Sequence, residues 1–221
     1  MPIVEHLVAR MAALRRVDEI VMVVGYQAAT IVRHFGTHYR HLPITYREQP
    51  ARLGLINALQ CAAADVAGAP FLLMLGDEVT VEPRFEEFLT ESARYDALLG
   101  AVPEQPEELI RNTYTLLHGE DRLVHRLIEK PVIALNGLMG TGIVALPADT
   151  FDLIERTPVH PVRGERELPG LLQTMVDEGR RVGWFPICVT YANVNYGTDL
   201  QRVAEDPRFH PGAGSRQAVL S

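Results

Sequence analysis

The amino-acid sequence predicts an α/β fold, a three-layer sandwich with a mostly parallel sheet and a small β-rich insertion. In its first half, short apolar runs typical of strands alternate with patterns typical of amphipathic helices. The pattern then changes to closely spaced strands with a turn signal between them, which predicts the insertion. With 221 residues and 47% hydrophobic content, the chain can bury one sizeable core, so we expect one main domain.

The first unit is a helix followed by a strand. Five apolar side chains between Val4 and Leu14 recur at helical spacing, which predicts an amphipathic helix. Residues 19–26 (EIVMVVGY) are a β-branched apolar run that contains a glycine near its end. Such a run is typical of a strand covered on both faces, and therefore of a parallel sheet. A helix over 27–35 and a short strand over 43–46 follow.

The second unit ends at an acidic residue. After a loop, an Ala-rich helix is predicted for 54–66 and a strand for 70–75, which stops at Gly76-Asp77. In doubly wound sheets, ligands bind outside the carboxyl ends of the strands. Asp77 stands at such an end, so it is the first candidate site residue.

The rest of the chain alternates less regularly. The turn signal His118-Gly119-Glu120-Asp121 predicts a hairpin between strands over 113–118 and 123–127. The Pro- and Gly-containing end predicts a flexible tail over 206–221, which leaves 1–205 as the domain. The other predicted elements are helices over 84–92, 148–156 and 167–178, and strands over 96–102, 141–146 and 181–190.

Composition excludes several classes of partner. The formal net charge of -7 and the scattered Lys and Arg residues argue against nucleic acid, whose phosphates need a basic face. No apolar stretch has the length of a membrane span, and the start lacks the layout of a signal peptide, so we expect a cytoplasmic protein. Cys61 and Cys188 fit reduced core thiols better than a disulfide.

A series of segments over residues 2–205 resembles the sugar-1-phosphate nucleotidyltransferases, in particular the glucose-1-phosphate thymidylyltransferases and uridylyltransferases. Each segment alone is weak, but their common order is specific. The resemblance implies a Rossmann-like, nucleotide-binding sheet and a reaction of a sugar-1-phosphate with a nucleoside triphosphate, which gives an NDP-sugar and pyrophosphate. The segments are PIVEHLVARM, EIVMVVGYQAATIVRHF, REQPARLGLINAL, FLLMLGDE, LIEKP, GTGIVALPADTFDLIE, RGERELPGLLQTMVDEGRRV and YANVNYGTDLQRV.

The resemblance implies a Mg²⁺ site made by Asp77 and Asn193. The MLGD segment places Asp77 where the family has a metal-binding carboxylate, and YANVNYGTDL places Asn193 where the second ligand commonly is an aspartate. Mg²⁺ prefers oxygen ligands, and a neutral amide oxygen should hold it more weakly than a carboxylate. The alternative is that Gly76-Asp77 and Asn193 only form turns.

Glu129 and Lys130 match the family's Glu-Lys-Pro element. The resemblance implies that the Glu129 carboxylate accepts hydrogen bonds from sugar hydroxyls and that the Lys130 ammonium faces the sugar phosphate, which makes Lys130 catalytic together with Asp77. An acceptor-only carboxylate and a compact charge suit these roles. A solvated strand end is the alternative.

Four more positions match substrate-binding segments. The resemblance implies that Gln49 and Gly54 recognise base and ribose, that Gly140 opens the strand that contacts the sugar, and that Glu165 belongs to the Arg-Gly-Glu element. An amide can pair with a base edge, and a glycine lets a ligand approach the backbone. Gly54 as a plain helix N-cap is the alternative.

The family opens with a strand and a glycine-rich, Arg-containing loop that holds the triphosphate, and Met1 stands after this position. Because such electrostatic stabilisers each contribute about 10²- to 10³-fold in rate, we expect no pyrophosphate release from this chain alone. The chain is then either a shortened form of an enzyme or a non-catalytic homologue that acts as a ligand-binding or partner subunit. We also expect a homodimer or a replacement strand at the edge that the first strand would cover. A GT-A-type glycosyltransferase with a metal near Asp77 and Glu78 would leave the Glu-Lys-Pro element unexplained.

Overall fold

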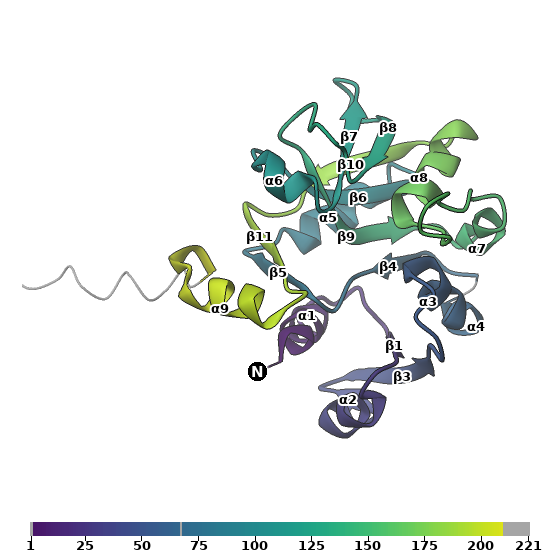
Figure 1. Cartoon of the computed structure of the whole chain (residues 1–221). Coiled ribbons are helices and arrows are strands. Elements are labelled where there is room, and N and C mark those ends of the chain that lie inside the picture. Colours follow the sequence, from purple (N-terminus) through teal and green to yellow (C-terminus); the bar gives the residue numbers. More distant parts are fainter. Residues whose placement is uncertain (1, 67, 210–221) are drawn as a thin grey trace, which may run out of the picture.

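The structure, a computed structural model, describes residues 2–66 and 68–209 and confirms the α/β fold class (Figure 1). The N-terminal part is a small sheet in the order β1-β3-β2, with β1 and β3 parallel. Its core consists of the buried side chains of Val8, Phe35 and Ile44, which pack two helices against the strands. These elements are α1 (Ile3–Met11), β1 (Ile20–Val24), α2 (Ala28–Phe35), β2 (His38–Tyr39) and β3 (Leu42–Glu48).

The second sheet has the strand order β10-β6-β9-β7-β8, and β4 pairs with the other side of β9 near its end. The predicted hairpin is confirmed as the antiparallel pair of β7 and β8. The strands are β4 (Phe71–Leu73), β6 (Ala97–Val102), β7 (Tyr114–His118), β8 (Val124–Glu129), β9 (Met139–Leu146) and β10 (Val182–Pro186).

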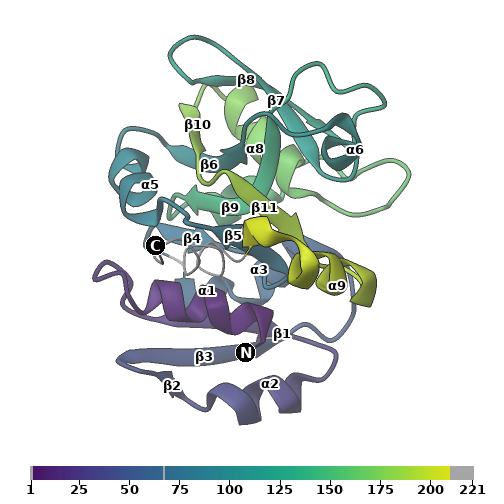
Figure 2. The same ribbon diagram turned by 90° about the vertical axis from the view of Figure 1, so that its left-hand side faces the viewer.

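Helices cover both faces of this sheet, as alternation along β6 shows. Ala97 and Leu99 belong to the core beneath α3, α7 and α8, whereas Leu98 and Val102 belong to the core beneath α1, α5 and α6 (Figures 1 and 2). The three layers expected from the sequence are therefore present. The helices are α3 (Leu55–Cys61), α4 (Ala63–Val66), α5 (Phe85–Ser92), α6 (Glu107–Ile110), α7 (Thr150–Ile154) and α8 (Leu168–Asp177).

The share of parallel pairing is lower than the sequence suggested. Only β1 with β3 and β10 with β6 run parallel among the described strands, and the pairs made by β9 are antiparallel. The reason is the position of β9. This strand follows the β7–β8 hairpin in the chain and lies between β6 and β4, antiparallel to both. Among the described strands, β1 pairs only with β3, and β4 pairs only with β9.

The strand predicted over 181–190 is wrong as one element. It ends as β10 at Pro186, which lacks the N–H needed to extend a ladder, and resumes as β11 (Thr190–Asn193). β11 pairs antiparallel with β5 (Glu78–Val81). The sequence did not predict β5, because this strand directly follows the Gly76-Asp77 turn signal. The helix predicted over 54–66 is likewise divided, at Ala62.

The C-terminal part begins with α9 (Gly197–Glu205), whose first turn is capped by Asp199, since its Oδ2 accepts from the N–H groups of Asn195 and Tyr196. A 3₁₀ turn, Pro207–Phe209, follows inside the predicted tail, whose remainder at 210–221 lies outside the described residues. Along the described chain, no helix is both long and apolar enough to cross a membrane.

Candidate active site

The β5–β11 pair brings the two expected metal ligands together. Asn193 is the register partner of Glu78, and the Val194 N–H donates to the carbonyl oxygen of Asp77 at 2.8 Å. Asp77 therefore lies on the turn that enters β5, directly beside the end of β11. Burial raises the pKa of Asp77, which a cation nearby would oppose.

The donor set at this point fits a hard cation. The Asn193 Oδ1 atom is buried and has no hydrogen-bond partner in the described structure, so an amide oxygen is free to act as a ligand. The described residues hold no cluster of three or more His, Cys, Asp or Glu side chains that could bind a metal. A cation held by Asp77 and Asn193 would complete its shell with water and substrate oxygens, as Mg²⁺ commonly does.

Glu78 is a buried carboxylate that the sequence placed near a metal only in the glycosyltransferase alternative. Its Oε1 atom accepts from the Gly142 N–H and from the Tyr191 hydroxyl, both at 2.6 Å. Burial, helped by the neighbouring charge of Asp77, raises its pKa to about 7 despite these two hydrogen bonds. The only signal in the sequence was its place after Asp77, which does not reveal a buried side chain.

The Glu129–Lys130 pair lies at the end of β8. Lys130 adopts a left-handed φ of 42°, and its backbone N–H donates to Thr113 O at 2.7 Å, so hydrogen bonding holds an unusual conformation at this point. The Lys130 Nζ lies 3.9 Å from Glu129 Oε1, and the Lys130 side chain is half exposed. Burial and the charge of Glu167 raise the pKa of Glu129 to about 7, against the opposing effect of nearby cations.

Arg163 is a residue to which the sequence assigned no role. Its Nη2 lies 3.4 Å from Glu129 Oε1 and 2.5 Å from Glu167 Oε2, so one guanidinium joins two carboxylates. Its Nε is buried and has no partner among the described residues. The sequence could have indicated it, since Arg163 begins the same Arg-Gly-Glu element as Glu165.

Gln49, Gly54 and Glu165 meet, although they come from three separate segments. The Gln49 Nε2 donates to the Gly54 carbonyl oxygen and to Asn57 Oδ1, each at 3.0 Å. Gly54 has a φ of 85°, and a Cβ there would lie 2.3 Å from Glu165 Oε2. The structure therefore places these three predicted site residues together, and it explains why position 54 requires glycine.

Gly140 is required by packing. A Cβ there would lie 2.1 Å from Cε2 of Tyr114, whose hydroxyl donates to Thr141 O at 2.7 Å. The glycine thus lets a buried aromatic ring lie flat on β9. Its predicted contact with a sugar stays a prediction.

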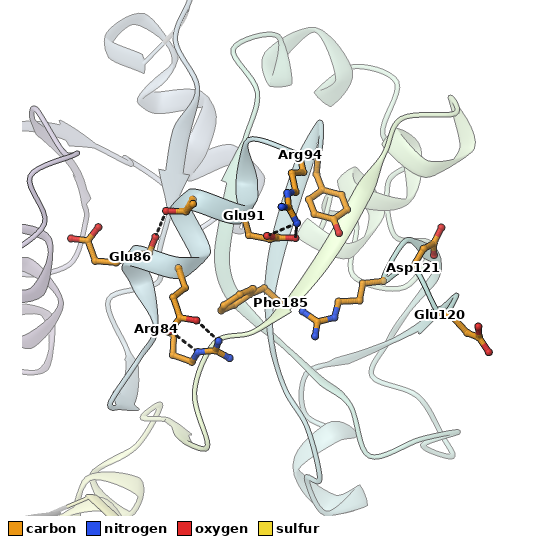
Figure 3. A pocket seen from close by; sticks show the side chains of 11 residues that line it. Arg84, Glu86, Glu91, Arg94, Glu120, Asp121 and Phe185 are labelled. Atoms are coloured by element: carbon orange, nitrogen blue, oxygen red, sulfur yellow. Dashed lines mark hydrogen bonds and ion pairs between the residues drawn. The ribbon is translucent and has the colours of Figure 1, made fainter.

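A surface hollow of about 710 Å³ lies elsewhere, between α5, β10 and the β7–β8 turn (Figure 3). Its guanidinium groups at Arg84 and Arg94 are already paired with Glu87 and Glu91, and Arg84 lies over the Phe185 ring. None of the predicted site residues lines it. The hollow therefore carries no argument for an anionic ligand.

Comparisons with known proteins show the family to which the chain belongs. The nucleotidyl transferase family model matches residues 1–187. The chain is 28% identical over 222 residues to the UTP–glucose-1-phosphate uridylyltransferase AglF of Haloferax volcanii, covering 93% of this chain and 85% of AglF. It is 30% identical over 182 residues to the bifunctional protein GlmU of Methanocaldococcus jannaschii, covering 82% of this chain but only 41% of GlmU.

A solved UDP-glucose pyrophosphorylase in complex with UDP-glucose has the same fold, with a TM-score of 0.77 at 16% identity over 90% of this chain and 85% of that one. The resemblance recognised in the sequence is thus confirmed by independent comparisons. Because the family model covers most of its length, this chain belongs to the nucleotidyl transferase family, and its relatives place it with the sugar-1-phosphate nucleotidyltransferases of that family.

Proposed function

We propose that the site formed by Asp77, Asn193, Glu129 and Lys130 binds a sugar-1-phosphate and a nucleoside triphosphate for nucleotidyl transfer. The observation that carries this proposal is the junction of β5 and β11, which brings Asp77 beside Asn193 across 116 residues of sequence (193 − 77). The family membership of the chain supports the reaction class. The products would be an NDP-sugar and pyrophosphate.

Mg²⁺ is the cation that this donor set suits, with Asp77 as the charged ligand and Asn193 as the neutral one. When bound, it would supply positive charge that neutralises part of the charge on the reacting phosphates. The unpartnered Asn193 Oδ1 supports this assignment.

The chain's own residues would do most of the positioning. The half-exposed Lys130 ammonium would hold the sugar phosphate as a point charge, while Glu129 would accept hydrogen bonds from sugar hydroxyls. Gln49 and the backbone at Gly54 would contact base and ribose, with Glu165 beside them. An oxygen of the sugar phosphate would then attack the α-phosphorus, and the bond to pyrophosphate would break.

The glycosyltransferase alternative loses support from the position of Glu78. Its Oε1 atom is engaged by Gly142 and Tyr191, and its side chain is only 2% exposed. The family model that matches residues 1–187 is that of the nucleotidyl transferases, which supports nucleotidyl transfer instead. We therefore do not propose that class.

Uridine and glucose are the first ligands to test, because AglF is named for UTP and glucose-1-phosphate. A cytoplasmic location is consistent with the free Cys61 and Cys188, and both it and a homodimer stay predictions. The division into a domain at 1–205 and a tail at 206–221 also stays a prediction.

The test combines binding and turnover. Calorimetry on the purified chain with glucose-1-phosphate, UDP-glucose and Mg²⁺ should show saturable binding, and Lys130→Asn should weaken the binding of glucose-1-phosphate. A coupled assay would record pyrophosphate release from UTP. Binding without release would identify a ligand-binding subunit. Absence of binding of all three ligands would reject the site.

A further inference from the structure

One face of the β5–β11 pair is polar although it is turned into the protein. Glu78 and Thr80 are two residues apart on β5, so their side chains share a face, and they are only 2% and 5% exposed. Their register partners on β11 are Asn193 and Tyr191. Four polar side chains therefore lie next to one another on an inner face, where apolar residues would normally stand.

Hydrogen bonding on this face is incomplete. Of the five buried side-chain atoms without a partner in the described residues, three belong to it: Glu78 Oε2, Thr80 Oγ1 and Asn193 Oδ1. Buried polar atoms are nearly always paired, so such a concentration indicates a place that serves a ligand. Asn193, as a candidate metal ligand, lies at the edge of this group.

One oxygen of Glu78 joins three strands. Its Oε1 accepts from the Gly142 N–H on β9 and from the Tyr191 hydroxyl on β11, both at 2.6 Å, while the residue itself belongs to β5. Distances this short are typical of hydrogen bonds to charged groups, which are about twice as strong as neutral ones.

Position 142 permits this contact only because it is glycine. A Cβ there would lie 2.3 Å from Leu75 Cγ and 2.9 Å from Glu78 Oε1. Both contacts are closer than real Cβ atoms show, so any side chain would push the Glu78 carboxylate away from β9. This glycine and the buried carboxylate thus form one arrangement.

We propose that Glu78 is a positioning residue that fixes the candidate metal ligands relative to the strand expected to contact the sugar. Asp77 precedes Glu78 directly, Asn193 follows Tyr191 by two residues, and Gly140 precedes Gly142 by two. Each bond that Glu78 makes therefore fixes backbone close to one part of the site. This inference rests on the proposed function, since it assigns Glu78 to the same site.

The experiment uses calorimetry of the full chain with Mn²⁺ and, separately, with glucose-1-phosphate. Tyr191→Phe removes one hydroxyl and should weaken Mn²⁺ binding about fivefold, the effect of one net hydrogen bond. Glu78→Leu removes both bonds and should weaken both ligands, by about tenfold or more. Glu78→Gln keeps an Oε1 acceptor without the negative charge, so it should weaken both ligands clearly less than Glu78→Leu does.

Two further variants separate this inference from the proposed function. Asp77→Ala should lose Mn²⁺ but keep glucose-1-phosphate, whereas Tyr46→Phe, which removes a hydroxyl hydrogen bond to Gly36 O near the N-terminal sheet, should change neither affinity. If the unaltered chain and Asp77→Ala bind Mn²⁺ equally, the proposed metal site is wrong.

If the unaltered chain binds Mn²⁺ and Asp77→Ala does not, the Tyr191 and Glu78 variants decide whether the inference holds. Unchanged affinities in Tyr191→Phe would overturn it, as would a Glu78→Gln variant as weak as Glu78→Leu. Tyr191→Phe keeps the test valid even where Glu78→Leu does not fold, because it changes a single hydroxyl.

Discussion

Gly54 and Glu165 are 111 residues apart in the chain (165 − 54), and a Cβ at position 54 would lie 2.3 Å from the Glu165 carboxylate. The same glycine has a φ of 85° and receives a hydrogen bond from Gln49 on its carbonyl oxygen. Position 54, directly before α3, therefore requires glycine for two reasons: its backbone conformation and the space that the Glu165 carboxylate occupies.

We expect Gly54→Ala to lower the free energy of unfolding more than the same change at a glycine that has a positive φ but open space around it. We expect Gly54→Ala to lower the free energy of unfolding by about 2–4 kcal/mol, from an unfavourable φ of about 1–2 kcal/mol plus displacement of Glu165. Gly36, with a φ of 66°, a ψ of −147° and open space around it, is the matched control. Urea unfolding of both variants measures the difference, and equal losses would show that Glu165 moves aside freely.

Adding a negative charge to the proposed metal ligands tests their role in cation binding. Asn193→Asp would add a second carboxylate beside Asp77, so we expect Mg²⁺ or Mn²⁺ to bind about tenfold more tightly, because affinity rises with ligand charge. Asp77→Ala should abolish binding. Asp121, an exposed carboxylate in the β7–β8 turn, provides the control Asp121→Ala, which should bind as the unaltered chain does. Calorimetry measures all three affinities, and unchanged binding by Asp77→Ala would remove Asp77 from the site.

The sequence predicted the parts of the fold that local pattern determines. The amphipathic helices, the apolar run of β1 and the β7–β8 hairpin follow from periodicity and turn residues. The antiparallel position of β9 could not be predicted this way, because strand order depends on contacts between distant segments. β5 was missed since its four residues follow a turn signal that reads as the end of a strand.

The candidate site divides in the same way. Asp77, Glu129 and Lys130 could be named because each belongs to a short motif, and the resemblance supplied Asn193. Glu78 could not, because its importance lies in hydrogen bonds to residues 64 and 113 positions away. Tyr191 and Gly142, which make those bonds, carry no local signal of a buried carboxylate either.

Removing the Lys130 ammonium should weaken binding of the sugar phosphate without loss of structure. Lys130→Asn is the suitable change, because asparagine tolerates the left-handed φ of 42° better than most residues. We expect glucose-1-phosphate affinity to fall about 10-fold or more, the loss of a charge-assisted contact of about 1.5–3 kcal/mol. Arg126→Gln removes an exposed cation from β8, the strand that precedes Lys130, and should leave the affinity unchanged. A matching decrease in both variants would indicate a general charge effect.

The pKa of Glu129 predicts a pH dependence of stability that one substitution should remove. The value is raised from 4.5 to about 7, chiefly by burial and then by the charge of Glu167. A group whose pKa is higher in the folded state binds its proton more tightly there, so its contribution to stability is complete below pH 4.5 and is lost as the pH rises through about 7. Glu129→Gln carries no such proton. The difference in the free energy of unfolding between Glu129→Gln and the unaltered chain should therefore shift in favour of the variant from pH 5 to pH 8.

Glu78 has a pKa raised to about the same value and contributes a slope of the same sign, so the slope of the unaltered chain contains both groups. Comparing Glu129→Gln with Glu78→Gln at each pH separates them, because each variant removes one of the two contributions. Urea unfolding at pH 5, 6, 7 and 8 provides the free energies. A difference between Glu129→Gln and the unaltered chain that stays constant over this range would mean that Glu129 ionises normally in the folded protein. The neighbouring Arg163 and Lys130 would then outweigh burial, and the carboxylate would be charged before any sugar arrives.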